Sequence, residues 1–265
     1  MDNATGISPA SLASQLGEFP PPQLIDVRRQ GAVDRDPVVL ASAIRRTPER
    51  VAQWSQTLEP WRRVVVYCVH GHEVSQEAAT ALRASGYAAA HLDGGLEGWR
   101  AAGGTLFPLS TPTRWVTRER PKIDRIACPW LIRRFVDPAA EFHYVPNADV
   151  RSFAAAHDAT PYDIPDVAYS HDGAQCSFDA FLRIHDLHDP ALDRLALIVR
   201  GADTDDLALA AQAPGLLAVS LGLSAMIAND AAMLRWGLLV YDALYAWCRT
   251  ALGEKHGWNP AALRA

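Results

Sequence analysis

Two short, almost continuous apolar runs in the first half of the chain predict β-strands, at residues 23–28 (QLIDVR) and 63–68 (RVVVYC). Such runs are typical of strands that a parallel sheet buries on both faces. The second run is followed by a polar loop, a helix-favouring stretch over 74–85 and another apolar run over 87–92. This order predicts a right-handed crossover, which places the loop after Cys68 at the carboxyl edge of the sheet, where α/β folds bind ligands.

The second half of the chain has a different pattern. From about Pro190 onward it consists almost entirely of segments with helical apolar periodicity. We expect helices over 191–199, 207–226 and 229–249, which together can form the core of a bundle. The stretch 108–113 has the composition of a linker. The sequence therefore predicts an α/β domain with a parallel sheet over 1–110, followed by a mainly α-helical (α+β) domain over 113–265.

The composition agrees with two soluble domains. A chain of 265 residues that is 49% apolar can bury two cores. With 21% charged residues and a net charge of −5, neither a disordered protein nor a general nucleic-acid binder is indicated. The longest apolar stretch, 216–228, is shorter than the ~20 residues of a membrane span. The N-terminus has neither the basic start nor the apolar run of a secretory signal, so we expect a cytoplasmic protein without membrane contact.

The four cysteines, Cys68, Cys128, Cys176 and Cys248, are single and far apart, which favours free thiols over disulfides. Cys68 stands between a strand and a helix, where loop amides and the helix dipole favour a thiolate. The predicted cradle around it is Val69, His70, Gly71, His72, Glu73 and Val74. The alternatives are that Cys68 is a small buried hydrophobe and that the two histidines are solvent-facing, or hold an adventitious metal.

The first domain resembles a single rhodanese module, the sulfurtransferase family. Four motifs carry the resemblance, in chain order: Leu24-Ile25-Asp26-Val27-Arg28, Ala43-Ile44, Tyr67-Cys68-x-x-Gly71-x-x-Val74-Ser75 and Leu92-Asp93-Gly94-Gly95-Leu96-Glu97-Gly98-Trp99. The resemblance implies a rhodanese-like parallel sheet, with Cys68 as the residue that takes up sulfane sulfur as a persulfide. It also implies mainly structural roles for Asp26 and Arg28.

The loop departs from the family pattern at two places. Many thiosulfate-using relatives carry arginine where this chain has Val69 and Glu73. Because both guanidinium groups are missing and a carboxylate is added, we expect poor affinity for thiosulfate. The expected donor is the persulfide of a small thiol or of a partner protein. The related phosphatase pattern Cys-x5-Arg is also broken, since the sixth place after Cys68 is Val74.

A basic segment opens the second domain. Residues 114–134 hold seven basic and two acidic side chains, whereas the rest of the domain is acidic. Apolar residues at helical spacing predict a helix there, which Pro129 kinks or delays. In one interpretation these basic residues form a solvated surface or ion pairs with the acidic remainder of the domain. In the more specific interpretations they form an anion pocket or contact nucleic acid. No helix-turn-helix pattern accompanies the segment, which disfavours nucleic acid. The candidate anion-binding residues are Arg118, Lys122, Arg125 and Arg133.

Two turns further along collect potential metal ligands. The first runs from His171 to Asp179 and includes Cys176, and the second surrounds Asp203. Together His171, Cys176 and Asp203 are a candidate three-ligand site for a transition metal, although the spacing differs from that of a zinc knuckle. The alternative interpretation is ordinary turn chemistry and helix capping, in which case the protein needs no cofactor.

Residues from about 113 to 250 resemble the bacterial chromate-resistance protein domain. The motifs are Trp115-Val116-Thr117-Arg118, Pro121-Lys122-Ile123-Asp124-Arg125-Ile126-Ala127-Cys128-Pro129-Trp130-Leu131-Ile132-Arg133-Arg134-Phe135, Cys176-Ser177-Phe178-Asp179, Ile198-Val199-Arg200-Gly201-Ala202-Asp203-Thr204-Asp205 and Tyr241-Asp242-Ala243-Leu244-Tyr245-Ala246-Trp247-Cys248. The family is associated with chromate efflux operons, in which members are discussed as sensors or regulators.

Two hypotheses follow. In the first, a rhodanese-type sulfurtransferase carries a persulfide on Cys68 and is linked to chromate resistance through a second domain that binds an oxyanion, with chromate as a candidate, or a metal. In the second, the chain is a non-catalytic, chromate-responsive regulator that contacts DNA or a partner through residues 114–134. Salt dependence separates them, because DNA binding through that segment must weaken steeply with ionic strength.

Overall fold

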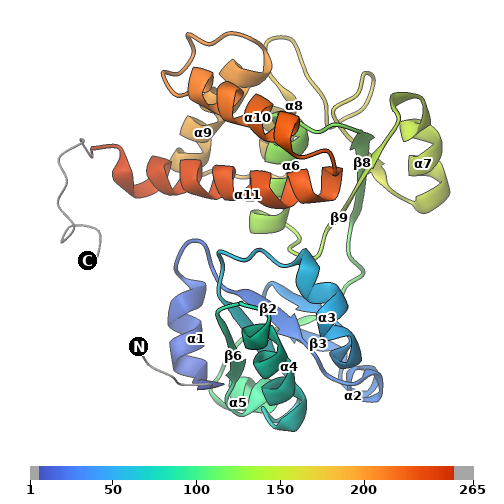
Figure 1. Cartoon of the computed structure of the whole chain (residues 1–265), viewed down its shortest axis with the longest axis vertical. Coiled ribbons are helices and arrows are strands. Elements are labelled where there is room, and N and C mark those ends of the chain that lie inside the picture. The colour runs from blue at the N-terminus through green and yellow to red at the C-terminus, as the bar shows by residue number, and fades with distance from the viewer. Residues whose placement is uncertain (1–5, 254–265) are drawn as a thin grey trace.

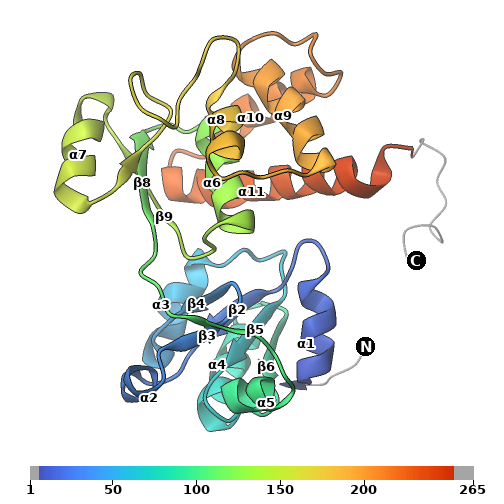
Figure 2. The same cartoon turned by 180° about the vertical axis from the view of Figure 1, so that it is seen from behind.

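The computed structural model describes residues 6–253 and divides them between a sheet-based part and a largely helical part (Figures 1 and 2). In the first part, a sheet with the strand order β1-β6-β5-β2-β4 is parallel throughout, and β3 pairs with β7 in a small antiparallel ribbon. Its strands are β1 (Gly6–Ile7), β2 (Gln23–Asp26), β3 (Val38–Leu40), β4 (Ala43–Arg45), β5 (Val64–Tyr67), β6 (Ala89–Leu92) and β7 (Leu106–Pro108). Its helices are α1 (Pro9–Leu16), α2 (Gln30–Arg35), α3 (Val51–Trp54), α4 (Glu73–Ala84) and α5 (Gly95–Ala101).

The central strand β5 is buried on both faces, as its apolar run predicted. Val65 and Tyr67 face one core, together with side chains of α1 and α5. Val64 and Val66 face a second core, formed with α3 and α4. This division follows from the two-residue period of a strand. The sheet is therefore covered on both sides, and the loop between β5 and α4 opens at its carboxyl edge.

The second part joins a three-stranded parallel sheet, in the order β10-β8-β9, to a group of helices. The strands are β8 (Arg114–Arg118), β9 (Glu141–Val145) and β10 (Thr160–Pro161). The helices are α6 (Asp124–Phe135), α7 (Val150–His157), α8 (Ser177–Ile184), α9 (Pro190–Asp203), α10 (Ala213–Met226) and α11 (Asp230–Ala246). Trp115 of β8 packs into the main helical core, whereas Val116 faces α7. No described helix is long and apolar enough to cross a bilayer.

The basic segment 114–134 takes two forms in the structure. Its first residues are strand β8, which the sequence pattern did not predict, and the rest is α6, which contains Pro129. Every residue of α6 from Ile126 to Ile132 is buried in the helical core. The helix is thus a central element of the second part, and its arginines lie at its two ends.

The two parts meet where the segment before β2 and the segment before β5 pack against α11. Phe19 contacts Tyr245 with a ring-centroid distance of 4.7 Å, and Trp61 lies 5.9 Å from Trp236. The indole of Trp61 also donates a hydrogen bond of 3.1 Å to the Asp242 carboxylate. The stretch 109–113 connects β7 to β8 without regular structure. Contact between the parts therefore depends on packing and polar bonds as well as on the connecting chain.

Candidate functional site

Cys68 lies directly after β5 and is 7% exposed. Its Sγ is 3.2 Å from the Ser75 hydroxyl, which is in reach of the His72 carbonyl as well. The backbone N–H groups of residues 69–74 donate to no acceptor within the described part of the chain. Unpaired amides at the start of a helix form a site for anions. The loop therefore offers a row of donors beside a thiol.

Glycines hold this loop in shape. Gly71 has a φ of +72°, and a Cβ there would lie 2.5 Å from the Leu92 carbonyl oxygen. Gly95 has a φ of +58°, and its Cβ would lie 2.4 Å from the Cys68 carbonyl oxygen. The amides of Leu96 and Glu97 donate to the carbonyls of residues 68 and 69. The start of α5 therefore packs directly against the loop. This close approach leaves no room for a Cβ at Gly95, which explains why the last motif has glycine there.

A hollow of about 390 Å³ opens over Cys68. The loop residues Val69, His70, His72, Glu73 and Val74 line it. Arg29 and Arg35, before and at the end of α2, also line it, and the sequence did not reveal these two residues as part of the site. In the sequence, Arg29 is marked only by its position directly after the Asp26–Arg28 motif, and Arg35 is not marked at all.

Asp26 and Arg28 form a buried ion pair beneath this hollow, with Nη2 and Oδ2 2.6 Å apart. Arg28 also donates to the carbonyls of Asp36 and Val38, so it ties β2 to the chain around α2. Burial would lower the pKa of Arg28, but its bonds to Asp26 raise it. This geometry is that of a structural pair, which matches the role implied for the two residues.

A second group of polar side chains lies in the helical part. His171 Nε2 is 3.1 Å from Asp203 Oδ2, 3.5 Å from Asp163 Oδ1 and 3.7 Å from Asp124 Oδ2. His171 and Asp203 are thus brought together, as two of the three predicted ligands. Asp124, at the start of α6, and Asp163, in a turn with a φ of +53°, were not among the predicted residues. Each looks like an ordinary cap or turn residue in the sequence.

Cys176, the third predicted ligand, does not belong to the convergent set of potential ligand atoms. Potential ligand atoms of Asp124, Asp163 and His171 all lie within 4.8 Å of one another, and no cysteine belongs to that set among residues 6–253. Cys176 is fully buried at the start of α8, where its amide donates to Asp179. Burial, with the carboxylate of Asp124 nearby, raises the pKa of this thiol.

The four predicted anion-binding residues do not share one pocket. Arg118 and Arg125 both pair with Asp163, at 2.9 and 3.4 Å. Lys122 precedes α6 and forms no ion pair with a described residue. Arg133, at the other end of α6, donates to the Ala140 carbonyl at 3.2–3.3 Å.

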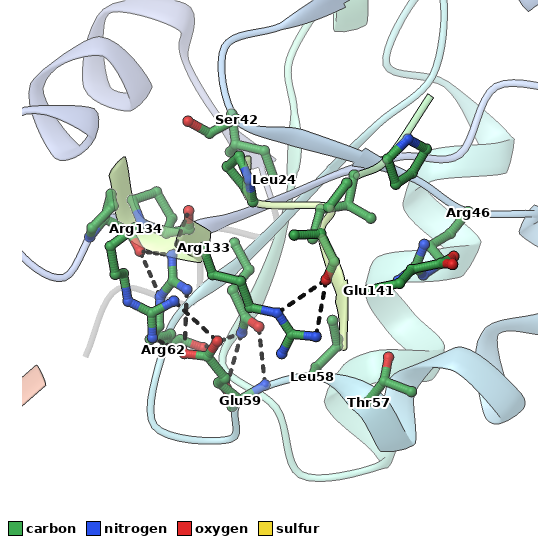
Figure 3. A pocket seen from close by; sticks show the side chains of 18 residues that line it. Leu24, Ser42, Arg46, Thr57, Leu58, Glu59, Arg62, Arg133, Arg134 and Glu141 are labelled. Carbon is green, nitrogen blue, oxygen red and sulfur yellow. Dashed lines mark hydrogen bonds and ion pairs between the residues drawn. The ribbon is translucent and has the colours of Figure 1, made fainter. Parts of the chain in front are cut away.

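Arg133 lines a cavity of about 200 Å³ between the two parts (Figure 3). Four arginines line this cavity: Arg46, Arg62, Arg133 and Arg134. Figure 3 shows Arg62 and Arg134 around Glu59, with Arg46 on another side of the lining. Arg46 and Arg133 have no carboxylate partner within salt-bridge distance in the described structure, and burial lowers the pKa of both. The cavity therefore has an excess of positive charge.

Comparison with known families agrees with this division into two parts. The model described as the rhodanese-like domain matches residues 8–102, so the first part is a rhodanese-like domain. The model described as ChrB, C-terminal domain, matches residues 115–248, which is half of the chain. The chain therefore belongs to the ChrB C-terminal domain family, with a rhodanese-like domain in front.

Individual relatives match parts of the chain. Protein ChrB of Cupriavidus metallidurans is 36% identical over 145 residues, which cover 52% of this chain and 43% of that protein. The chain thus spans less than half of the length of this relative. A rhodanese-related protein from Thermoplasma volcanium is 22% identical over 38% of this chain and 96% of its own, with a TM-score of 0.34. The Alr3790 protein from Anabaena is 28% identical over 39% and 82%, with a TM-score of 0.35.

Proposed function

We propose that this protein is a sulfurtransferase that carries sulfane sulfur as a persulfide on Cys68. The observation that supports this most directly is the row of unpaired amides at residues 69–74 beside the Cys68 thiol. A persulfide adds a terminal sulfur about 2 Å beyond Sγ, and that sulfur carries negative charge when ionised. Amides without other partners can stabilise this charge without giving up existing bonds.

The transfer is a pair of exchange steps at sulfur. The Cys68 thiolate attacks the outer sulfur of a donor persulfide, the donor S–S bond breaks, and the donor leaves as a thiolate. An acceptor thiolate then attacks the outer sulfur on Cys68, and the Cys68 thiolate returns. The Ser75 hydroxyl, 3.2 Å from Sγ, can donate to that thiolate between the two steps. The sulfane sulfur changes carriers, and no external oxidant or reductant is consumed.

The hollow over Cys68 bears on the choice of donor. Glu73 in its lining opposes a dianion such as thiosulfate, whereas Arg29 and Arg35, which also line it, favour negative charge. A persulfide of a small thiol, with a single ionised sulfur and a larger body, suits this mixed lining better than thiosulfate. We therefore propose a small persulfide or a partner protein's persulfide as donor.

The test is the intact mass of the reduced protein after exposure to glutathione persulfide and, separately, to thiosulfate. The expected result is an adduct of roughly 32 Da that needs Cys68 and forms more readily from the persulfide. Cys68→Ser removes the carrier, and Cys248→Ser is the matched control, since Cys248 is also a buried thiol. An adduct that survives in Cys68→Ser, or no adduct from either donor, would refute the proposal.

The cavity between the two parts favours a second function, recognition of a small oxyanion such as chromate. Arg46 comes from the rhodanese-like domain and Arg133 from the ChrB-family part. Glu59 and Glu141 also line the cavity, but within the described part of the chain neither arginine lies within 4.0 Å of a carboxylate. Buried charges are normally paired, so an anion held by both guanidiniums would remove this imbalance. Because it would touch both parts, such an anion would also favour their association.

Molybdate, a tetrahedral dianion that does not oxidise thiols, is the probe for this function. Calorimetry should detect its binding to the full chain, and Arg133→Met should weaken it about tenfold or more while keeping the apolar stem. Arg151→Met is the control, since Arg151 is an exposed arginine outside the cavity. Equal affinity in both variants, or no binding to the unaltered chain, would exclude this cavity as an oxyanion site.

A further inference from the structure

The group around His171 contains a buried carboxylate oxygen without a partner. Asp124 is 1% exposed, and its Oδ2 accepts hydrogen bonds from the amides of Ser177 and Phe178. Its Oδ1 is buried and has no hydrogen-bond partner. A charged oxygen in this state is costly unless a positive group compensates it. The protein therefore retains at this point an acceptor that its own described residues leave unused.

The charges around Asp124 are also unbalanced. Asp163 has two guanidinium partners, Arg118 and Arg125. Asp124 and Asp203 have His171 as their one ion partner in the described structure. A single imidazole thus serves both Asp124 and Asp203, so positive charge is unevenly distributed within the group.

We propose that Asp124, Asp163 and His171 bind a divalent transition-metal cation, with Asp203 as an adjoining carboxylate at the edge of the site. Ligands at 2.0–2.2 Å from a common ion lie roughly 3–3.5 Å from one another. The His171 Nε2 is 3.5 Å from Asp163 Oδ1 and 3.7 Å from Asp124 Oδ2, and one potential ligand atom from each of the three residues lies within 4.8 Å of the others, so the side chains already converge. The ligand atoms come from three separate segments that the fold has already brought together.

The ligand chemistry defines the class of cation. Two carboxylates and one imidazole suit Mn²⁺, Fe²⁺ or Zn²⁺, whereas copper(I) prefers thiolates. Neither Cys128 nor Cys176 belongs to the ligand set among residues 6–253. The ion has a route from solvent, because His171 is 42% exposed and a surface hollow of about 650 Å³ is lined by Asp163 and His171.

This site is separate from the chemistry proposed for Cys68. It lies in the ChrB-family part, between β10, the start of α6 and the end of α9, whereas Cys68 lies in the rhodanese-like sheet. The metal site goes beyond the proposed sulfur transfer and does not depend on it. Persulfide loading and metal binding can therefore be measured independently on the same full-length chain.

The experiment is calorimetric titration of the full chain with Zn²⁺, and paramagnetic resonance with Mn²⁺, after removal of metal by a chelator. We expect one bound ion per chain. Asp124→Asn should keep the hydrogen bonds that the backbone amides of Ser177 and Phe178 donate to its side-chain oxygen, but weaken the affinity for the ion by about tenfold or more. His171→Gln should weaken the affinity by a similar factor. His171 is partly exposed, so this second variant should fold even if Asp124→Asn does not.

Two matched controls make the test specific. Asp172→Asn removes an exposed carboxylate next to His171 in sequence and should leave the affinity unchanged. Cys176→Ser should also leave it unchanged, because the thiol lies outside the ligand set. The proposal is wrong if no ion binds, if His171→Gln binds Zn²⁺ as tightly as the unaltered chain, or if Cys176→Ser loses the affinity instead.

Discussion

Arg134 of α6 and Glu59 of the rhodanese-like domain form an ion pair across the interface of the two parts, with Arg134 Nη1 3.2 Å from Glu59 Oε1. The same guanidinium donates to Asp242 of α11, at 2.8 Å from Nε. Burial alone would lower the pKa of Arg134, but Glu59 and Asp242 raise it. The guanidinium therefore stays charged and joins three elements that are far apart in the sequence.

Removal of this guanidinium should destabilise the whole chain. The side chains of Arg134 and Glu59 are only 2% and 8% exposed. In Arg134→Met, Glu59 keeps only its pair with Arg62, and the buried Asp242 carboxylate loses its one cationic partner in the described structure. The expected loss is about 3–5 kcal/mol in the free energy of unfolding, measured by urea denaturation. The control is Arg114→Met, which breaks an exposed pair with Glu141 and should cost at most about 1 kcal/mol. Similar losses in both variants would contradict a buried role for Arg134.

The order of strand, loop and helix around Cys68 could be predicted from the sequence because its determinants are local. A strand, a glycine-bearing loop and a helix follow one another, so the cradle can be inferred from residues 63–75 alone. The group around His171 could be predicted only in part. Asp124, Asp163 and Asp203 come from segments up to about eighty residues apart, and only the packing of α6 against α8 and α9 brings them together. Nothing in the local pattern distinguishes Asp124 from a helix-capping residue.

For the basic segment 114–134, the sequence revealed the charged residues but not their partners. Its charges were visible, and ion pairs with the acidic body were one of the interpretations considered. Arg118, Arg125 and Arg134 each form such pairs. Which carboxylate each would meet was not visible, since Asp163 and Asp242 lie far along the chain and Glu59 belongs to the other domain. Long-range partners of this kind depend on tertiary packing and leave no periodic signal.

Glu73→Arg should improve the use of thiosulfate. Glu73 lines the hollow over Cys68, and its replacement by a guanidinium adds a charged donor beside the dianion. A gain of about 1.4 kcal/mol in binding corresponds to a KM for thiosulfate about tenfold lower, which steady-state sulfur transfer can detect. Glu77→Arg is the matched control, because this substitution changes the charge of α4 by the same amount at a residue that does not line the hollow. An equal effect in the control would assign the change to net charge.

Gly71→Ala should abolish persulfide loading in a protein that still folds. The added Cβ would lie 2.5 Å from the Leu92 carbonyl and 2.7 Å from the Gly94 nitrogen, so the loop must move away from α5. Gly86→Ala is the control: its φ is +87° but nothing lies within 4 Å of the added Cβ, so it tests backbone strain alone, at about 1–2 kcal/mol. The mass of the persulfide adduct and the thermal melting curve distinguish the two variants. Normal loading in Gly71→Ala would show that the cradle tolerates displacement.

His171 should make the stability of the metal-free protein depend on pH. Its hydrogen bond to Asp163 and the charges of Asp124 and Asp203 raise the pKa of His171 to about 9, from 6.5 for a free imidazole. Because the folded state holds the proton more tightly, this stabilisation is complete below pH 6.5 and is lost as the pH rises through about 9. The raised pKa of Asp124 acts in the same direction. Urea denaturation in the presence of a chelator should show the unfolding free energy falling across this range.

His171→Gln isolates the contribution of the imidazole, since Asp124 and Asp163 remain in place. The difference in unfolding free energy between the unaltered chain and this variant should shrink as the pH rises from 6.5 to 9, because only the protonated imidazole attracts the carboxylates. His188→Gln is the control, because His188 pairs with one carboxylate, Asp186, at an exposed position. If the difference for His171→Gln stays constant with pH, the ring acts through packing alone and the carboxylates around it carry less negative charge than their geometry indicates.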